Sequence, residues 1–233
     1  TNDKYYALLI GNDEYQFWSK LGASVNDVQS VSSILTKKYG FETETLINAT
    51  SEEIKNKLFE YTEKIKEQDN LLIYYAGHGD LNTNMSPPRA YWIPVDGGKK
   101  IDAKWINTQD VSAIISLIKA KHILIMVDSC YSGSSMRGTS KTEVTTKDQI
   151  NDKKYIEKLL MRKTRLLITS GGVEPVVDVS VENHSLFAYK FLDILKENDN
   201  YITGSMIWSE LNKHHGTANQ NPEIKWLKEM GDL

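Results

Sequence analysis

Four short runs of apolar residues constrain the fold of this 233-residue chain more than any other feature. Each run is continuous rather than alternating, which is typical of strands buried on both faces of a parallel sheet. Each run also ends in small or polar residues that mark a turn. The runs cover residues 5–10, 71–75, 123–127 and 166–168, and a weaker run at 42–47 predicts a further strand at an edge.

Segments with the apolar spacing of helices lie between these strands. One helix is predicted over residues 24–39, where Gly40 provides a C-terminal stop. A second follows Thr50, a typical N-cap residue. Further helices are predicted from Thr108, after Ser185 and after Ser205. Strands that alternate with helices predict an α/β fold with a mostly parallel sheet of about six strands, flanked by helices on both faces.

Two segments lack this periodicity. Residues 80–98 contain Pro87 and Pro88 and further turn clusters, so we expect a long loop with one short apolar piece, Tyr91-Trp92-Ile93. Residues 132–150 are rich in Ser, Thr and Lys and predict an exposed loop.

Composition narrows the function classes. The formal net charge is -3, so no overall positive field favours nucleic acid or an anionic membrane surface. No apolar run approaches the roughly 20 residues of a membrane span, and no secretory signal opens the sequence. Cys130 is the only cysteine, which excludes an internal disulfide and a zinc site built on several thiolates. We therefore expect a cytoplasmic protein that binds neither nucleic acid nor membrane.

A histidine between two glycines follows the second buried run, in the sequence Gly77-His78-Gly79. Ligands bind at the carboxyl ends of the strands in such a sheet. Glycine on both sides allows the backbone to approach a substrate closely. A lone histidine is often a structural residue, but this placement favours a functional role for His78.

Cys130 follows another buried run, in the sequence Asp128-Ser129-Cys130. A lone cysteine is usually a small buried hydrophobic residue. It acts as a nucleophile only as the thiolate, which a nearby imidazole makes accessible near neutral pH. If the two strands are neighbours, His78 as base and Cys130 as nucleophile can face the same substrate carbonyl. The backbone N–H groups of Gly79 and Cys130 are then candidate oxyanion donors.

Taken together, Tyr75-Ala76-Gly77-His78-Gly79 and Asp128-Ser129-Cys130-Tyr131-Ser132-Gly133 resemble the motifs of the caspase and metacaspase superfamily, specifically its bacterial caspase-like (orthocaspase) branch. The histidine stands 52 residues before the cysteine, and a separation of about 50 residues is typical of caspases. The resemblance extends over nearly the whole chain, from residues 7–12 and Asn26-Asp27 to residues 169–172 and 184–187.

This resemblance implies a caspase-hemoglobinase fold with one catalytic domain over residues 1–233. It also implies a large-subunit-like part at about 1–136, a linker at about 137–163 and a small-subunit-like part at about 164–233. The site would be a Cys-His dyad in which a backbone carbonyl orients the histidine, without an acidic third member.

In metacaspase-like relatives, acids that match Asp27 and Asp128 line the S1 pocket, which holds the residue before the scissile bond, and Ser24 stands where many carry Cys. Two carboxylates in a partly desolvated slot would bind a guanidinium or ammonium group and disfavour an acid. We therefore expect cleavage after Arg or Lys, with the bidentate fork of Arg preferred. Glu174 and Asp178 lie on a loop that shapes substrate pockets in relatives and are candidates for a further contact.

The linker between the two parts is often self-cleaved in relatives. Here it carries basic residues that match the expected specificity, among them Arg137, Lys141 and Lys147. Self-cleavage there and an uncut, solvated loop are both open alternatives.

Two departures from the family pattern matter. Tyr131 replaces the His that metacaspases usually place after the nucleophile. Metacaspases that need calcium carry an acid several residues past the cysteine, whereas residues 134–137 read Ser-Ser-Met-Arg. Because calcium needs several oxygen ligands, we expect no calcium requirement, and no metal or cofactor.

The sequence thus predicts a cysteine endopeptidase that cleaves proteins or peptides after Arg or Lys through a thioester acyl-enzyme. Regulatory domains or partner proteins are further expected partners. Two alternatives are a catalytically silent scaffold or signalling domain, and a clostripain- or legumain-like relative with another specificity. The presence of both His78 and Cys130 argues against a silent site.

Overall fold

The structure is a computed structural model and describes residues 3–129, 138–139, 162–171, 181–213 and 222–227. Its middle layer is a seven-stranded sheet in the order β2-β1-β3-β7-β9-β10-β8. The strands are β1 (Tyr5–Gly11), β2 (Glu42–Ile47), β3 (Asn70–Ala76), β7 (His122–Asp128), β8 (Gly138–Thr139), β9 (Thr164–Thr169) and β10 (Glu223–Leu227). The first five in spatial order are parallel, and β10 and β8 are antiparallel to their neighbours. The predicted α/β fold with a mostly parallel sheet is confirmed.

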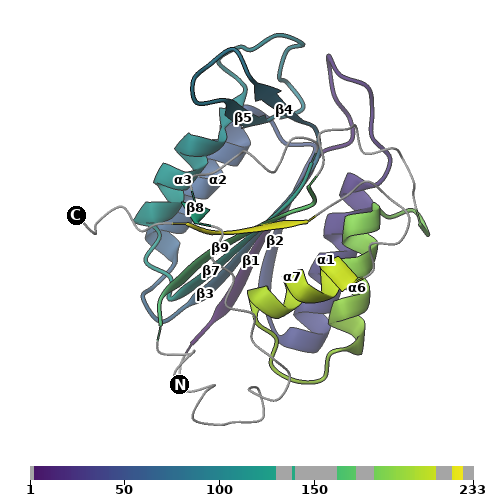
Figure 1. The fold of residues 1–233 in the computed structure, drawn as a ribbon, viewed down its shortest axis with the longest axis vertical. Coiled ribbons are helices and arrows are strands. Elements are labelled where there is room, and N and C mark those ends of the chain that lie inside the picture. The colour runs from purple at the N-terminus through teal and green to yellow at the C-terminus, as the bar shows by residue number, and fades with distance from the viewer. Residues whose placement is uncertain (1–2, 130–137, 140–161, 172–180, 214–221, 228–233) are drawn as a thin grey trace.

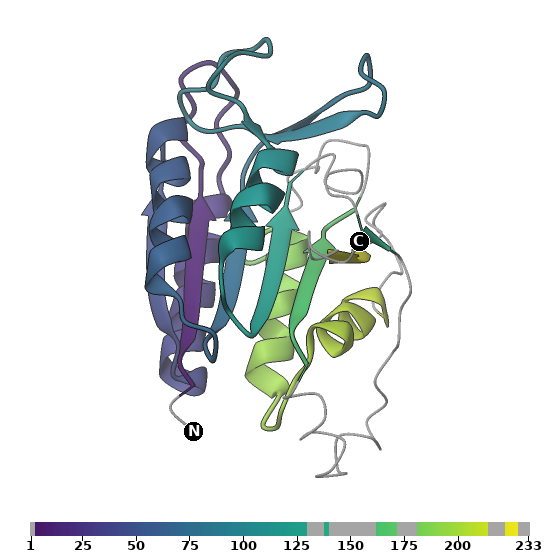
Figure 2. The ribbon, with the colours of Figure 1, turned by 90° about the vertical axis from the view of Figure 1, so that its left-hand side faces the viewer.

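Helices cover both faces of this sheet (Figure 1 and Figure 2). One face carries α1 (Ser24–Tyr39), α6 (Leu186–Glu197) and α7 (Gly204–Lys213), and the other carries α2 (Ser51–Lys64) and α3 (Thr108–Leu117). Ile73 and Tyr74, neighbours in β3, are both fully buried but belong to the cores on opposite faces. Alternate side chains of a strand point to opposite faces, so a sheet covered on both sides needs the continuous apolar runs seen in the sequence.

Short polar signals set the helix ends. Thr50 and Glu53 form a capping box at the start of α2, in which each side chain accepts a hydrogen bond from the backbone N–H of the other. Gly40 ends α1 in the left-handed conformation, with φ at 71°. Ser185 caps α6, where its hydroxyl oxygen accepts a hydrogen bond from the N–H of Ala188.

Residues 80–98 differ from the long loop that we predicted. Three short strands, β4 (Gly79–Asn82), β5 (Arg89–Trp92) and β6 (Ile106–Asn107), form an antiparallel sheet in that order. Trp92 of β5 is buried and stacks on Tyr75 of β3, with ring centroids 4.6 Å apart. This burial makes the short apolar piece a strand. The small sheet lies beyond the carboxyl end of β3, beside α3 (Figure 1).

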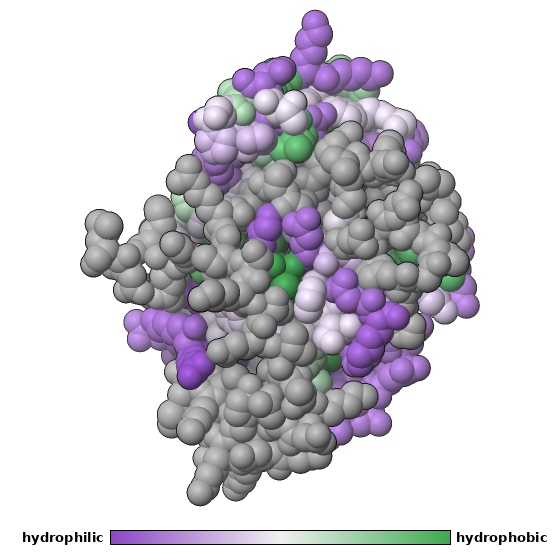
Figure 3. Space-filling model, viewed as in Figure 1, coloured by the Kyte–Doolittle hydropathy of each residue, from purple (hydrophilic) through white to green (hydrophobic). Residues whose placement is uncertain are grey.

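The described surface is largely polar. On the face drawn in Figure 3, hydrophobic residues reach the surface only in small areas between hydrophilic ones. Large exposed apolar side chains such as Phe17, Phe59 and Tyr201 lie on separate elements. Each helix of the described residues is too short or too polar to span a membrane.

Candidate active site

The carboxyl ends of β1, β3 and β7 meet at one edge of the sheet. Gly11 is level with Ala76 in the β1–β3 register, and Ala76 is level with Asp128 in the β3–β7 register. The N–H of Gly77 donates a hydrogen bond of 3.2 Å to the Asp128 carbonyl. The segment that carries His78 is therefore fixed beside the segment that leads to Cys130.

Cys130, the predicted nucleophile, lies outside the described residues. Its chain neighbour Ser129 is buried, with 4% of its surface exposed. The Ser129 carbonyl accepts a hydrogen bond of 3.3 Å from the Ser170 hydroxyl, which follows β9. Ser129, the last described residue before Cys130, thus lies at the edge of the sheet at which His78 lies.

Two tyrosines hold the backbone of His78. Its N–H donates a hydrogen bond of 2.8 Å to the hydroxyl oxygen of Tyr15, and its carbonyl accepts one of 2.7 Å from the Tyr75 hydroxyl. The imidazole packs between aromatic rings, with centroids 4.6 Å from Tyr15 and 5.3 Å from Trp18. Gly77 makes this packing achievable, because a Cβ there would lie 2.5 Å from the Tyr15 hydroxyl oxygen.

A backbone carbonyl selects the tautomer of His78. Its Nε2 lies 2.8 Å from the carbonyl oxygen of Ser19. A carbonyl oxygen only accepts hydrogen bonds, so Nε2 must carry the proton. In the neutral imidazole Nδ1 is then the nitrogen with a lone pair, which is the atom a general base uses.

The predicted oxyanion donors are only partly described. Gly79 follows His78 as the first residue of β4, where it is buried and pairs with Trp92. Cys130, the second donor, lies outside the described residues. The oxyanion assignment stays a prediction.

The Asp13 carboxylate and Gly11 place α1, and with it Asp27, at the same edge of the sheet as His78. The N-cap residue of α1, Ala23, makes no side-chain hydrogen bond. Instead the Asp13 carboxylate, from the loop after β1, accepts hydrogen bonds from the N–H groups of Ser24 (3.0 Å) and Val25 (3.1 Å). Gly11 also permits the close approach, since a Cβ there would lie 2.7 Å from the Ser24 carbonyl oxygen.

Asp27 and Asp128, which we call the pocket acids, are brought together by the start of α6. The Ser185 hydroxyl donates a hydrogen bond of 2.5 Å to Asp128, and the Ser185 N–H donates one of 3.3 Å to Asp27. The Asp27 carboxylate also lies 2.7 Å from Nδ1 of His184. Ser24 is buried one turn before Asp27 on the same side of α1.

Burial dominates the electrostatics of the pocket acids. Only 1% of Asp27 and 6% of Asp128 is exposed. Burial raises the pKa of each carboxyl to about 7, against the lowering effect of the Ser185 hydrogen bonds. Burial also lowers the pKa of His184. Both shifts favour the uncharged form of each group in the unliganded protein, whereas a cationic side chain beside the acids would favour their ionised form.

Several predicted residues cannot be placed. The candidates for a further substrate contact, Glu174 and Asp178, lie outside the described residues. The same holds for the basic linker residues Arg137, Lys141 and Lys147. Their assignments stay predictions.

Sequence reasoning missed the residues that hold the site in place. Tyr15, Trp18 and Ser19 contact His78 from a loop about 60 positions earlier in the chain. His184 was placed in a family-like motif and Ser185 ahead of a helix, but neither was assigned to the pocket. The one available signal was the aromatic content of the loop after β1, whose residues 15–18 read Tyr-Gln-Phe-Trp.

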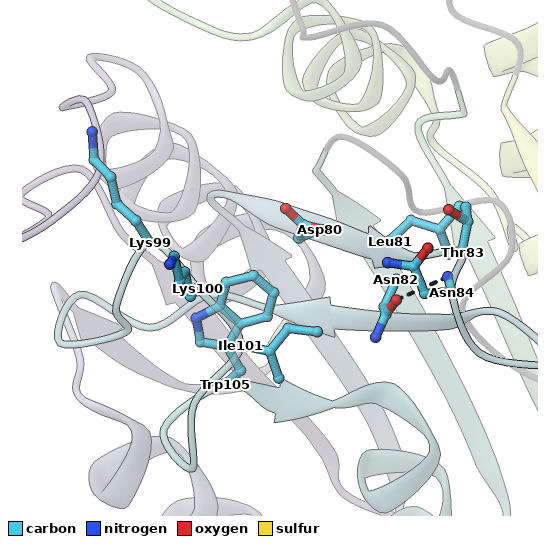
Figure 4. A pocket seen from close by; sticks show the side chains of 9 residues that line it. All are labelled: Asp80, Leu81, Asn82, Thr83, Asn84, Lys99, Lys100, Ile101 and Trp105. Carbon is cyan, nitrogen blue, oxygen red and sulfur yellow. Dashed lines mark hydrogen bonds between the residues drawn. The ribbon is translucent and has the colours of Figure 1, made fainter.

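An open hollow of about 460 Å³ lies beside the small sheet (Figure 4). Residues 80–84 form one side of it, and residues 99–101 and Trp105 form the other. It contains none of the predicted site residues. The pocket acids, in contrast, are buried and hydrogen-bonded.

Among the described residues, no group of three or more His, Cys, Asp or Glu side chains could hold a metal ion. Residues 130–137, on which the calcium argument rests, lie outside that search. The absence of a calcium requirement therefore stays a prediction.

The fold and the site define a class of α/β proteins in which a histidine and a cysteine follow adjacent central strands of a parallel sheet. Residues 4–222 match the Caspase domain family. The chain therefore belongs to the caspase domain family, within the caspase and metacaspase superfamily, as the sequence motifs predicted.

Curated relatives agree with this assignment. The chain is 30% identical over 127 residues to the human mucosa-associated lymphoid tissue lymphoma translocation protein 1, matching 53% of this chain and 15% of that protein. It is 27% identical over 149 residues to metacaspase-6 of Arabidopsis thaliana, matching 54% of this chain and 38% of that protein. The chain thus spans well under half of the length of these relatives.

Solved structures share the fold over almost the whole chain. Caspase-1 of Spodoptera frugiperda superposes with a TM-score of 0.66 at 14% identity, covering 99% of this chain and 92% of that one. A protein from Geobacter sulfurreducens superposes with a TM-score of 0.68 at 17% identity, covering 96% and 93%.

Proposed function

We propose that this chain is a cysteine endopeptidase that cleaves proteins or peptides after Arg or Lys. One observation carries the specificity: Ser185 joins two buried carboxylates, Asp27 and Asp128, at the edge of the sheet where His78 lies. An acidic pocket beside a histidine base fits a substrate with a cationic side chain next to its scissile bond.

The proposed reaction begins at the His78 imidazole. Nδ1 accepts the proton of the Cys130 thiol, and the thiolate attacks the scissile carbonyl carbon. The N–H groups of Gly79 and Cys130 stabilise the oxyanion. As the C–N bond breaks, Nδ1–H gives its proton to the departing amine and a thioester forms. Water, deprotonated by Nδ1, then hydrolyses the thioester and releases the carboxylic acid product and the thiol.

The orientation of His78 supports this role. The Ser19 carbonyl holds the proton on Nε2 and leaves Nδ1 as the basic nitrogen. An imidazole held by a carbonyl stays uncharged more readily than one held by a carboxylate, which suits a base that must accept a proton near neutral pH. A dyad of His78 and Cys130 therefore needs no acidic third member.

The specificity can be tested with a panel of four fluorogenic peptides that differ only in Arg, Lys, Asp or Asn before the scissile bond. We expect the protein to cleave the Arg and Lys peptides, and the Cys130→Ala variant to cleave none. Cleavage of the Asp peptide without the Arg peptide would contradict the acidic pocket. A correctly folded protein that cleaves no peptide would instead support the silent scaffold.

Self-processing in the linker follows from the same specificity. Arg137, Lys141 and Lys147 are the candidate sites. Intact mass of the purified protein, compared with Cys130→Ala, tests this proposal. Fragments that start after one of these residues and occur only with Cys130 would support it, and identical intact masses would remove it.

We also propose that activity does not depend on calcium. Turnover of the Arg peptide should be the same in excess EGTA as in millimolar calcium. A loss of activity in EGTA that calcium restores would overturn this expectation.

A further inference from the structure

A tight turn sets the position of His184. The backbones of Val181 and His184 exchange two hydrogen bonds of 3.0 Å. Glu182 and Asn183 between them adopt positive φ angles of 54° and 65°. Such conformations are unfavourable for residues other than glycine and persist where the surrounding structure fixes them. The turn therefore presents His184 to α1 in a defined orientation.

Hydrogen bonds also define the contacts of Ser185, the next residue. The Ser185 hydroxyl oxygen accepts a hydrogen bond of 3.0 Å from the N–H of Ala188, so its single proton is available to Asp128. The Ser185 N–H and His184 Nδ1 reach the two oxygens of Asp27 separately, at 3.3 and 2.7 Å. Two adjacent residues thus touch both pocket acids.

We infer that His184 and Ser185 are positioning residues of the acidic pocket, which hold the Asp27 and Asp128 carboxylates in the relative orientation that a guanidinium group needs. The inference rests on the proposed function, because it assigns the cation to these acids. A carboxylate oxygen has two lone pairs, so one hydrogen bond to each Asp27 oxygen leaves acceptor capacity for a ligand.

The orientation of the two carboxyl groups should matter more for binding an arginine side chain than for binding a lysine side chain. A guanidinium group offers donors in a rigid planar fork and requires acceptors at matching positions. An ammonium group is a compact charge whose three donors rotate, so it tolerates displaced acceptors better. Loss of the contacts from His184 and Ser185 to the pocket acids should therefore lower the affinity for an arginine side chain more than for a lysine side chain.

The experiment measures binding, so that turnover is not required. In the Cys130→Ala protein, calorimetry gives the affinity for Nα-acetyl-arginine amide, for its lysine counterpart and for its neutral citrulline counterpart. His184→Leu removes the imidazole contact to Asp27, and Ser185→Ala removes the hydroxyl that donates to Asp128. His184→Asn and Ser185→Thr retain a polar side chain at each position. Thermal unfolding is measured for every variant.

Two control variants each remove a comparable hydrogen bond elsewhere in the fold. His122 at the amino end of β7 also makes a hydrogen bond through Nδ1, of 2.9 Å to Thr164, and His122→Leu removes it. Asn107 caps α3 by accepting a hydrogen bond of 2.9 Å from Gln109, and Asn107→Ala removes that cap. Both lie away from the pocket acids.

We expect His184→Leu and Ser185→Ala to weaken arginine amide binding about tenfold, the loss that follows from one hydrogen bond. Lysine amide binding should weaken less, and the Asn and Thr variants should recover most of the affinity. The controls should lose thermal stability but no affinity, and citrulline amide should bind to none of the proteins.

Affinities that are unchanged in His184→Leu and Ser185→Ala would overturn the inference, while cleavage of Arg peptides by the protein with Cys130 would still support the proposed function. An unmodified pocket that does not bind arginine amide would overturn it as well. Conversely, binding that depends on these residues in a protein that cleaves no basic peptide would uphold the inference and contradict the proposed function.

Discussion

The surroundings of His78 and the acidic pocket are built from different parts of the chain. Tyr15, Ser19 and Tyr75, which hold His78, all precede it in the N-terminal part. The pocket acids also belong to that part, but they are contacted by His184 and Ser185, which directly precede α6. The residues that hold the base therefore come from the N-terminal part alone, whereas the pocket acids also need contacts from the C-terminal part. The two regions should respond separately to substitution.

His78→Asn should give the largest effect. Loss of a general base lowers kcat by about 10²–10⁴-fold. KM for the Arg peptide should change by less than about threefold, because the pocket acids keep their contacts. Steady-state kinetics with the fluorogenic Arg peptide measures both quantities. A variant with nearly normal kcat would show that another residue provides the base.

Asp128→Asn should affect the pocket and leave the base in place. Loss of one of the two carboxyl groups that a bound cation would ionise lowers kcat/KM for the Arg peptide by about 10²-fold. Alkylation of Cys130 by iodoacetamide should keep its rate. Asp69→Asn is the matched control, since Asp69 is also buried and accepts backbone hydrogen bonds, but at the amino end of β3. Equal losses in both variants would mean a general loss of structure.

Tyr15→Phe should produce a moderate effect on the His78 side. The substitution leaves the partly buried N–H of His78 without the hydroxyl that accepts its hydrogen bond, which costs about 1 kcal/mol. We expect a lower unfolding temperature, by about 2–4 °C per kcal/mol, and a reduced kcat with KM preserved. Tyr201→Phe, at a position that is 66% exposed, serves as control. A rise in KM at constant kcat would break the separation of the two regions.

The last prediction concerns the stability of the fold and its dependence on pH rather than activity. The pKa of Asp128 is raised from 3.8 to about 7 by burial, so the folded state binds a proton that the unfolded state releases between those values. The protein should therefore lose stability as pH rises from about 4 to about 7.

Asp128→Asn removes this titration. Both proteins carry Cys130→Ala, and they differ only in Asp128→Asn. The free energy of unfolding of the Asn variant, minus that of the protein with Asp128, should be near zero at pH 4. It should reach a few kcal/mol above pH 7, since one pKa unit is about 1.4 kcal/mol. Urea unfolding at several pH values measures the difference. Parallel pH curves for the two proteins would contradict the burial of a neutral acid.

The sequence identified the strands that are buried on both faces, because such strands need continuous apolar runs. It did not identify β5, whose burial depends on the distant Tyr75, or β10, a short strand at the antiparallel side of the sheet. Both depend on tertiary contacts more than on local pattern.

The candidate site divides in the same way. His78, Asp27 and Asp128 were predicted as site residues because each stands in a motif beside a strand or helix end. Ser19 and His184 were not assigned, because their contacts to the site bridge 59 and 157 positions and leave no local pattern. Candidate catalytic and binding residues are visible in motifs, whereas the residues that contact them emerge only from the fold.

The central claim is that a histidine-activated Cys130 lies beside an acidic pocket. Because Cys130 is the only cysteine, intact mass reads its alkylation without competing thiols. The measurement compares rates for iodoacetamide and for chloromethyl ketones of an arginyl and an aspartyl peptide.

We predict that the arginyl reagent reacts faster than the aspartyl one. Asp128→Asn should abolish this preference but keep the iodoacetamide rate, and His78→Asn should slow all three reagents. A faster reaction of the aspartyl reagent, or unchanged rates in His78→Asn, would contradict the claim.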